Sequence, residues 1–218
     1  SAGFGVAVSN ESAPTPQPVK ITGTNSMTGN YDGGLRVDSF GAVSVANLTA
    51  RGSVVGDGAT IYNQSGTGSV TFSGTNVFTD NQANGISIIS KGAISLSNVT
   101  ASGSATYHGA ALENSLGSTD SPPGVTISGT STFDGNALSG LFVNSIGTIT
   151  LAGVTARDNG DSGLELDNTG GTLARNVTIS GRALVSGNGA YGLVVLTPGA
   201  AKINNLTAES NGFGGAAS

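Results

Sequence analysis

The sequence predicts an all-β fold, a right-handed parallel β-helix of about eight coils with three short strands in each coil. Three observations support this prediction: two coil types alternate, their spacing is regular, and glycines follow short segments of alternating polarity. A fixed period of a few tens of residues indicates a solenoid, because one coil cannot bury its own apolar face. We expect a single domain over residues 1–218 that begins and ends in the middle of a coil.

The first strand of every coil opens with a short triplet that is apolar at its inward positions. The A coils open at residues 19–21, 70–72, 125–127 and 177–179, and the B coils open at residues 43–45, 94–96, 149–151 and 201–203. Each A triplet is followed 24 residues later by its B triplet, whereas the steps from B to A are 27, 31 and 28 residues. The constant step predicts a fixed coil, and the variable step predicts one corner with a loop of changing length.

The second and third strands follow at fixed offsets in the A coils. The second strand carries one large apolar residue: Met27, Phe78, Phe133 or Val185. The third strand carries two apolar residues around one outward residue, as in Leu35 and Val37, and glycines stand on both sides of it. Period two predicts strands, and glycines permit sharp corners. A single corner whose loop varies in length favours the right-handed form, because left-handed β-helices are built from uniform hexapeptides.

Polar residues occupy inward positions in two columns. A structural ladder is expected after the third strand, from Asn10, Ser39, Asn63, Ser90, Asn114, Ser145, Asn168 and Thr197. A second column is expected from Asn30, Asn81, Asn136 and Asn188. Buried amides are normally hydrogen-bonded, so each side chain should bond to the next or to corner backbone. Several asparagines stand in Asn-x-Ser/Thr triplets, which we interpret as structural rather than glycosylated.

Composition argues against several classes of function. The formal net charge is -5, and the eight Lys and Arg residues are scattered, so we expect no nucleic-acid partner. No run of 18 apolar residues and no signal peptide are recognisable, so we expect no membrane insertion. Cysteine is absent, which excludes disulfides. Low charge and many Ser, Thr, Asn and Gly residues favour an extracellular or cell-surface location.

The segment VTISGTSTFDGNALSGLFVNSIGTITLAGVTARDNG at residues 125–160 resembles right-handed parallel β-helix proteins. This group includes pectate-lyase-like enzymes and filamentous-haemagglutinin-like bacterial surface proteins, and the resemblance covers nearly the whole chain. The resemblance implies that an enzyme of the group would cluster aspartates with Lys, Arg or His on neighbouring coils. The aspartates of this chain fall at different coil positions. We therefore expect no catalytic residues, no cofactor and no enzyme activity.

Two polar features are weighed as possible sites. The acidic residues Asp158, Asp161, Glu165 and Asp167, with Glu113 two coils earlier, could offer oxygen ligands to calcium. Asn144 stands between Glu113 and Asp167 in one outward column. The sequence has no aspartate-glycine nonapeptide repeat and offers only three candidate side chains, so we predict a solvated acidic edge and no metal site. His108 is the only histidine and lacks a partner in the pattern, so it is expected to be a surface residue.

Two outward surfaces could contact a partner. The first strands present hydroxyl-rich columns that resemble ice-binding solenoids, although serine is frequent and lysine stands at both ends. The first column is Lys20, Ser44, Thr71, Ser95, Thr126, Thr150, Thr178 and Lys202. The third strands present a lateral apolar face made of Tyr62, Ile89, Phe142, Val194 and Leu196. Exposed apolar area suggests lateral packing against another chain.

The two ends of the chain share one coil phase, because residues 1–5 parallel residues 210–214. Uncapped β-helix ends expose backbone and core, so an end-to-end interface is expected. Its residues are Phe4, Gly5, Val6, Val8, Asn10, Phe213, Gly214, Gly215 and Ala216. The expected partner is self, by head-to-tail stacking or by continuation of the same solenoid, with glycans as a further possibility.

The leading functional hypothesis is a non-enzymatic structural module of an extracellular fibre or an adhesin-like scaffold. A carbohydrate-binding or carbohydrate-active β-helix is the alternative, and an ice-binding face is the third hypothesis.

Overall fold

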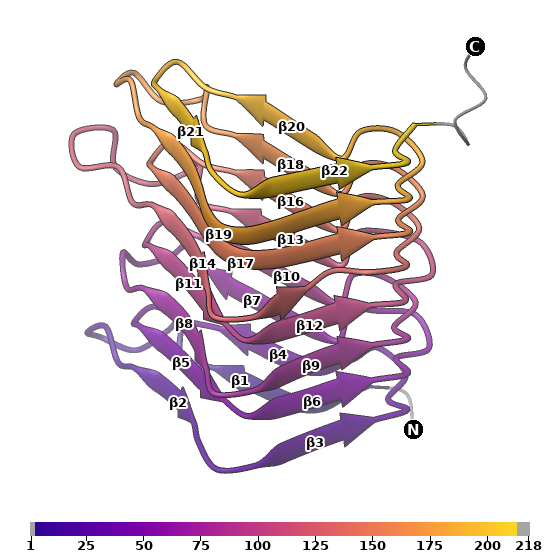
Figure 1. Ribbon diagram of the computed structural model, residues 1–218. Helices are drawn as coiled ribbons and strands as arrows, with labels where there is room; N and C mark the ends of the chain where they lie inside the picture. Colours follow the sequence, from indigo (N-terminus) through magenta and orange to yellow (C-terminus); the bar gives the residue numbers. More distant parts are fainter. Residues whose placement is uncertain (1–2, 213–218) are drawn as a thin grey trace.

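The structure is a computed structural model that describes residues 3–212, and these residues form strands and no helix. The strands stack as parallel coils of one β-solenoid, about eight turns long (Figure 1). In Figure 1 the near strands run from left to right and the far strands from right to left, while the chain climbs from N to C. This winding is right-handed, as predicted. No helix within residues 3–212 is long and apolar enough to cross a membrane.

Three columns of strands run along the stack. The first column contains β2 (Val19–Ile21), β5 (Val43–Ala46), β8 (Val70–Ser73), β11 (Ile94–Ser97), β14 (Val125–Ser128) and β21 (Ala201–Ile203). The second column contains β3 (Asn25–Thr28), β6 (Leu48–Arg51), β9 (Asn76–Thr79), β12 (Val99–Ser102), β15 (Ser131–Thr132) and β22 (Leu206–Glu209). Two strands, β17 (Ile149–Arg157) and β19 (Val177–Ser186), run through both columns, which joins them into one sheet.

The third column is a separate eight-stranded sheet. It contains β1 (Phe4–Ser9), β4 (Gly33–Asp38), β7 (Ala59–Asn63), β10 (Ile86–Ser90), β13 (Ala110–Glu113), β16 (Leu141–Asn144), β18 (Leu164–Asp167) and β20 (Leu193–Leu196). All neighbouring strands in both sheets are parallel, so each coil repeats the direction of the coil below.

The predicted coil register is confirmed. The 24-residue steps place Ile21 beside Val45, Phe72 beside Leu96, Ile127 beside Leu151 and Ile179 beside Ile203. The longer steps from B to A give the same alignment, because Val45 pairs with Phe72 and Leu96 with Ile127. The extra residues therefore lie in loops and leave the strands in register.

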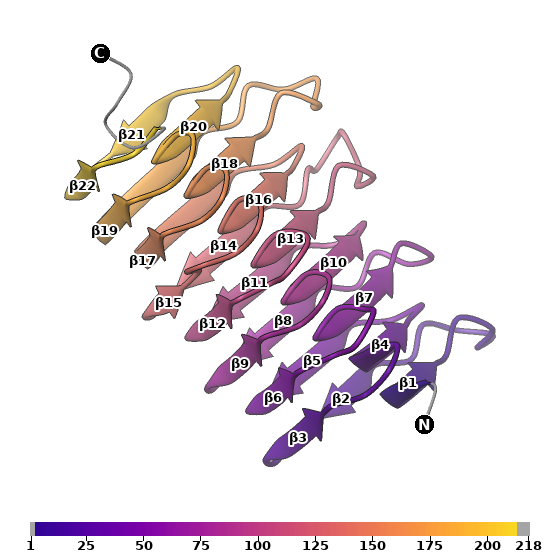
Figure 2. The same cartoon turned by 90° about the vertical axis from the view of Figure 1, so that its right-hand side faces the viewer.

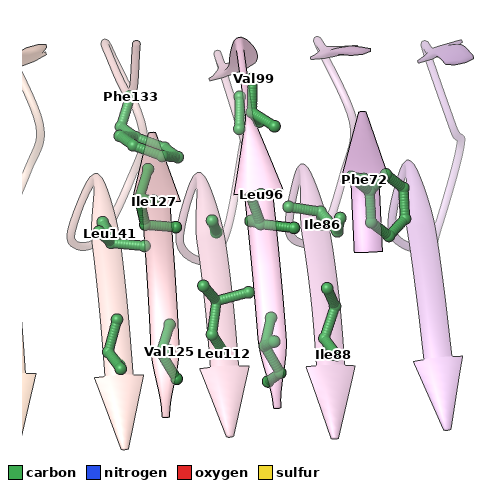
Figure 3. Close-up of a cluster of buried hydrophobic side chains, with 14 of the residues drawn as sticks. Phe72, Ile86, Ile88, Leu96, Val99, Leu112, Val125, Ile127, Phe133 and Leu141 are labelled. Atoms are coloured by element: carbon green, nitrogen blue, oxygen red, sulfur yellow. The ribbon is translucent and has the colours of Figure 1, made fainter. Parts of the chain in front are cut away.

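The core is a stack of apolar side chains enclosed by the three columns. Phe72, Phe78 and Phe133 are its largest buried residues, and the Phe72 and Phe78 rings meet edge to face with centroids 6.0 Å apart. Figure 3 shows Leu96 and Ile127 pointing inward from neighbouring coils among other apolar side chains. Each inward position is thus covered by the coil above and the coil below.

The loops of variable length all leave the solenoid from one edge, between the third column and the first (Figure 2). The loop of residues 115–124 lies within the longest step from a B triplet to an A triplet. Residues 118–121 at its tip are exposed. Surface loops tolerate changes in length better than strands do. The single corner with loops of variable length that the repeat predicted is therefore confirmed.

Candidate functional site

The predicted structural ladder after the third strand is buried in the inner coils. Ser39, Asn63, Ser90, Asn114, Ser145 and Asn168 are fully buried, while Asn10 and Thr197 in the end coils are half-buried. The serines act locally: Ser145 Oγ accepts the backbone N–H of Gly147 at 3.0 Å. The turn that follows each serine is thereby held.

The asparagines of this ladder hold the long loops. Asn168 Nδ2 donates to the carbonyl oxygens of Gly147 at 3.0 Å and Arg175 at 2.9 Å. Asn114 Nδ2 donates to the carbonyl oxygen of Pro123 at 2.9 Å. Both loop acceptors lie at the end of a variable loop, so each asparagine fixes the point where the chain re-enters the sheet.

Direct bonding between neighbouring ladder side chains is rare. Among residues 3–212 it occurs once, from Asn63 Nδ2 to Ser90 Oγ at 3.5 Å. Alternation of a long amide with a short hydroxyl explains this, because the hydroxyl bonds within its own turn. Of the two bonding modes expected, the bond to corner backbone dominates.

A continuous asparagine ladder exists at the corner between the second and third columns. Asn136 Nδ2 donates to Asn159 Oδ1 at 2.9 Å, Asn159 Nδ2 to Asn188 Oδ1 at 2.8 Å, and Asn188 Nδ2 to Asn211 Oδ1 at 2.8 Å. The backbone N–H of each lower asparagine donates to the same oxygen. Four consecutive coils are therefore tied together by side chains.

The prediction of this second column was incomplete, because it named only the A coils. The B coils contribute Ser53 and Ser104 in the lower half and Asn159 and Asn211 in the upper half. A local feature could have revealed them. Each ladder residue follows a residue in the left-handed region, such as Asp158 at φ 54° or Gly187 at φ 68°. Aspartate and glycine favour that region, so Asp/Gly-Asn pairs mark this corner.

The end coils expose residues that are buried elsewhere. Ile203 of β21 is 42 % exposed, while Ile179 directly beneath it is 0 % exposed. At the other end, Val6 of β1 is 38 % exposed, while Leu35 above it is 0 % exposed. Within the described chain, β1 pairs only with β4, and β21 only with β19. Each end thus presents open strand edges and apolar core positions.

The predicted end-to-end interface is described only in part. Val6 and Val8 lie in β1 opposite Leu35 and Val37, as the inward register requires. Gly5 is exposed in the same strand. The residues expected at the other end, Phe213, Gly214, Gly215 and Ala216, lie outside residues 3–212.

The N-terminal end of the third column carries an arginine between two aromatic rings. The Arg36 guanidinium carbon lies 5.8 Å from the Phe4 ring centroid and 5.2 Å from the Tyr62 ring centroid. Asp38 accepts from Arg36 Nε at 2.9 Å, and this bond raises the pKa of Arg36 above its ordinary value. Tyr62 therefore contacts a charged group of its own molecule.

The predicted lateral apolar residues fall into separate groups. Ile89 and Tyr62 are neighbours in one outward row. Phe142 lies in the other outward row, where Glu165 separates it from Val194. Tyr62, Ile89, Phe142 and Val194 are half-buried. Acidic residues therefore interrupt the face along the stack.

Leu196 is the most exposed member of this predicted face, at 52 %. It lines a small hollow of about 90 Å³ with Phe142, Glu165, Asp167 and Val194, among others. The hollow is too small for a typical ligand. Lateral packing against another chain stays a prediction for these residues.

His108 is more than the isolated surface residue that the pattern predicted. Its ring stacks on Phe142, with centroids 5.2 Å apart and an interplanar angle of 25°. Burial lowers the pKa of His108 below its ordinary 6.5, while the nearby Glu165 and Asp161 carboxylates oppose this shift. The ring therefore packs on the outer face of the third column as an apolar group.

The acidic column predicted on the third strands is present, with Asn144 between Glu113 and Asp167. Its carboxylates are engaged locally. Ser115 Oγ donates to Glu113 Oε1 at 2.9 Å, and Thr169 Oγ1 donates to Asp167 Oδ1 at 2.7 Å. Residues 3–212 contain no group of three or more His, Asp or Glu side chains placed to hold a metal ion.

The hydroxyl column of the first strands is aligned as predicted, since Ser95 pairs with Thr126 and Thr150 with Thr178. In the neighbouring outward row, Ser97 Oγ donates to the carbonyl oxygen of Phe72 at 3.2 Å. This hydroxyl is thereby turned toward the coil below. Ice binding stays a prediction, which a thermal-hysteresis measurement tests.

Comparison with protein-family models, with curated proteins and with solved structures finds no match to this chain. The β-solenoid is therefore established from the repeat and the strand pairing of the chain itself. A closer link to pectate-lyase-like or haemagglutinin-like proteins has no support beyond the shared architecture.

Proposed function

We propose that this chain is a non-enzymatic structural segment of an extracellular or cell-surface scaffold. In this proposal, coils of the same geometry continue the stack at its ends, either in a second copy or in the same polypeptide. The role matches that of the filamentous-haemagglutinin-like surface proteins that the sequence resembles.

The observation that carries this proposal is the open state of both end coils. Ile203 and Val6 occupy core positions and are more than a third exposed, and among residues 3–212 the outermost strands keep one unpaired edge. Exposed parallel edges beside apolar side chains are templates for pairing with another strand. A further coil would bury these side chains and pair these edges.

The asparagine ladder supports the same role. Asn211 accepts from Asn188 and donates through Nδ2 to the carbonyl oxygen of Val185 at 3.0 Å. Asn136, Asn159 and Asn188 each also donate through Nδ2 to an oxygen in the coil above. Asn211 is therefore placed to continue the ladder into a further coil.

Solution scattering and electron microscopy of the purified chain over a range of concentrations test the proposal. About eight coils at roughly 4.8 Å each give an axial length near 38 Å per unit. We expect particles that lengthen with concentration at constant cross-section, and filaments with that axial repeat. Lengthening by end stacking is expected because it buries the exposed core positions.

A pair of variants makes this test specific. Ile203→Lys places a charge on the end surface and should abolish lengthening. Thr178→Lys is the control, because Thr178 points outward from the coil beneath Lys202. Particles of constant length, with protected amide hydrogens in β21, would contradict the proposal.

A further inference from the structure

A groove of about 390 Å³ is lined by residues of β17 and β19 and by Thr130. Figure 1 shows β17 and β19 passing from the first column into the second. The lining residues of the groove combine cationic, hydroxyl, backbone and aliphatic groups: Thr130, Gly153, Thr155, Arg157, Arg182 and Leu184. A hollow of this volume is within the range that small ligands occupy.

The groove follows from a bulge in the sheet. The register between β17 and β19 shifts between Ala152 and Val154, where Gly181 and Arg182 together oppose Gly153. A bulge of this kind re-aims the side chain of the extra residue. Arg182 therefore stands at the rim, and Gly153 forms the floor.

The same corner is filled in the lower coils, where Asn47 and Asn98 occupy the position of Gly153. Asn98 Oδ1 accepts the backbone N–H of Thr130 at 3.0 Å, and Asn47 Oδ1 accepts that of Thr75 at 3.0 Å. These amides cover the corner. Gly153 carries no such amide, and a Cβ at this position would collide with the carbonyl oxygen of Gly129 in the coil below.

The rim departs from the repeat as well. The lower A coils carry threonine at the position of Arg182, as in Thr24, Thr75 and Thr130. Two departures from the repeat, the loss of an amide on the floor and the gain of a guanidinium on the rim, thus coincide at one place. The close approach of the Gly129 backbone accounts for the glycine at position 153. Arg182 makes no ion pair within residues 3–212, which suggests that this arginine serves a ligand.

The charges of the groove favour an anion. Arg157 is paired with Asp134, from Nη2 to Oδ2 at 2.9 Å, so these two charges balance. Arg182 is exposed, and within residues 3–212 it has no carboxylate within 4.0 Å. An unpaired guanidinium binds carboxylate or sulfate through two parallel hydrogen bonds.

We propose that this groove binds an anionic saccharide, whose carboxylate or sulfate group is held by Arg182. The Thr130 and Thr155 hydroxyls can exchange hydrogen bonds with sugar hydroxyls, and Leu184 offers an aliphatic surface to the C–H face of a ring. This binding role goes beyond the structural role proposed above and does not depend on end stacking.

Calorimetric titration of the purified chain tests this proposal with four probes. These are an oligogalacturonate, a sulfated galactan oligosaccharide, a neutral galactan oligosaccharide of equal length, and a polyglutamate peptide. At least one anionic saccharide should bind at least roughly tenfold more tightly than the neutral one, as expected for a charge-assisted contact. The tighter of the two identifies carboxylate or sulfate as the preferred group.

Arg182→Thr restores the residue found at this position in the lower coils, so the solenoid should retain its circular-dichroism spectrum. We expect it to weaken anionic binding by roughly tenfold or more. Arg51→Thr is the matched control, because Arg51 is an exposed arginine on β6 in the same column and lies outside the groove. The control should bind as the unmodified chain does.

Three results would overturn the proposal. The first is the absence of binding to both anionic saccharides. The second is an equal loss in the Arg51→Thr variant, which would show a general effect of net charge. The third is equal or tighter binding of the polyglutamate peptide, which would assign the groove to a protein partner.

Discussion

Asn159 is bonded twice to the same atom of Asn188 in the coil above. Its Nδ2 donates to Asn188 Oδ1 at 2.8 Å, and its backbone N–H donates to that oxygen at 3.2 Å. Asn159 Oδ1 in turn accepts both corresponding donors of Asn136. The unit repeats from Asn136 to Asn211, so each inner asparagine of this run satisfies polar groups of two coils at once.

Replacement of Asn159 by alanine should therefore destabilise the solenoid by about 2–4 kcal/mol. The buried backbone N–H of Asn136 and the carbonyl oxygen of Phe133 would lose a partner. Urea denaturation measures this change in the free energy of unfolding. Asn204→Ala is the control, because Asn204 is exposed, and an equal loss in both variants would show that the ladder contributes nothing.

The inward register of the first column predicts that aspartate destabilises the fold strongly at one position of β14 and only slightly at the adjacent position. Ile127→Asp should cost more than about 4 kcal/mol, because an unpaired carboxylate would be buried between two coils. Thr126→Asp should cost less than about 0.5 kcal/mol, because Thr126 is exposed. A denaturant titration compares the two variants, and equal destabilisation would refute the register.

The contrast between loop and strand predicts a positional effect of insertion. One glycine inserted after Asp120, in an exposed loop, should cost only a few tenths of a kcal/mol. The same insertion after Thr126, six residues later in β14, would turn Ile127 outward and should cost several kcal/mol. Thermal unfolding of both variants provides the comparison, and similar melting temperatures would be inconsistent with a rigid coil.

The sequence was sufficient to predict the coil register, because inward residues such as Ile127 and Leu151 repeat at a spacing that no other fold explains. The buried ladder was also predictable, since Asn63 and Asn168 stand where an apolar residue would otherwise be inward. These inward positions are buried between the coil above and the coil below, which restricts the residues they accept. The repeat of inward residues therefore stays recognisable although the outward residues vary.

Surface properties were harder to predict, because they depend on which side chains meet across coils. The stacking of His108 on Phe142 joins residues of different coils whose lateral offset is set by the corner geometry. The groove at Gly153 was missed because it lies at a bulge between β17 and β19, and one glycine among 36 carries no signal in the sequence. Pairing of strands across the bulge was required to identify it.

The stacked histidine predicts a dependence of stability on pH. The pKa of His108 is lowered by burial, so the unfolded chain binds a proton more readily than the folded chain. The folded state favours the neutral ring. The contribution of this ring to the stability of the fold is complete above the ordinary pKa of 6.5. It is lost as the pH falls from about 6.5 toward the lower pKa of the folded state.

Wild-type chain should therefore lose more thermal stability between pH 7.5 and pH 5.5 than His108→Gln. The variant lacks the stacking contact with Phe142 at every pH, so a constant difference in melting temperature between the two proteins is expected. The titration of His108 is reported only by how that difference varies with pH. Because His108 is the only histidine, its imidazole proton signal in NMR follows this group alone. A pKa at or above 6.5 in the folded chain, or parallel melting curves for both proteins, would contradict the buried, neutral ring.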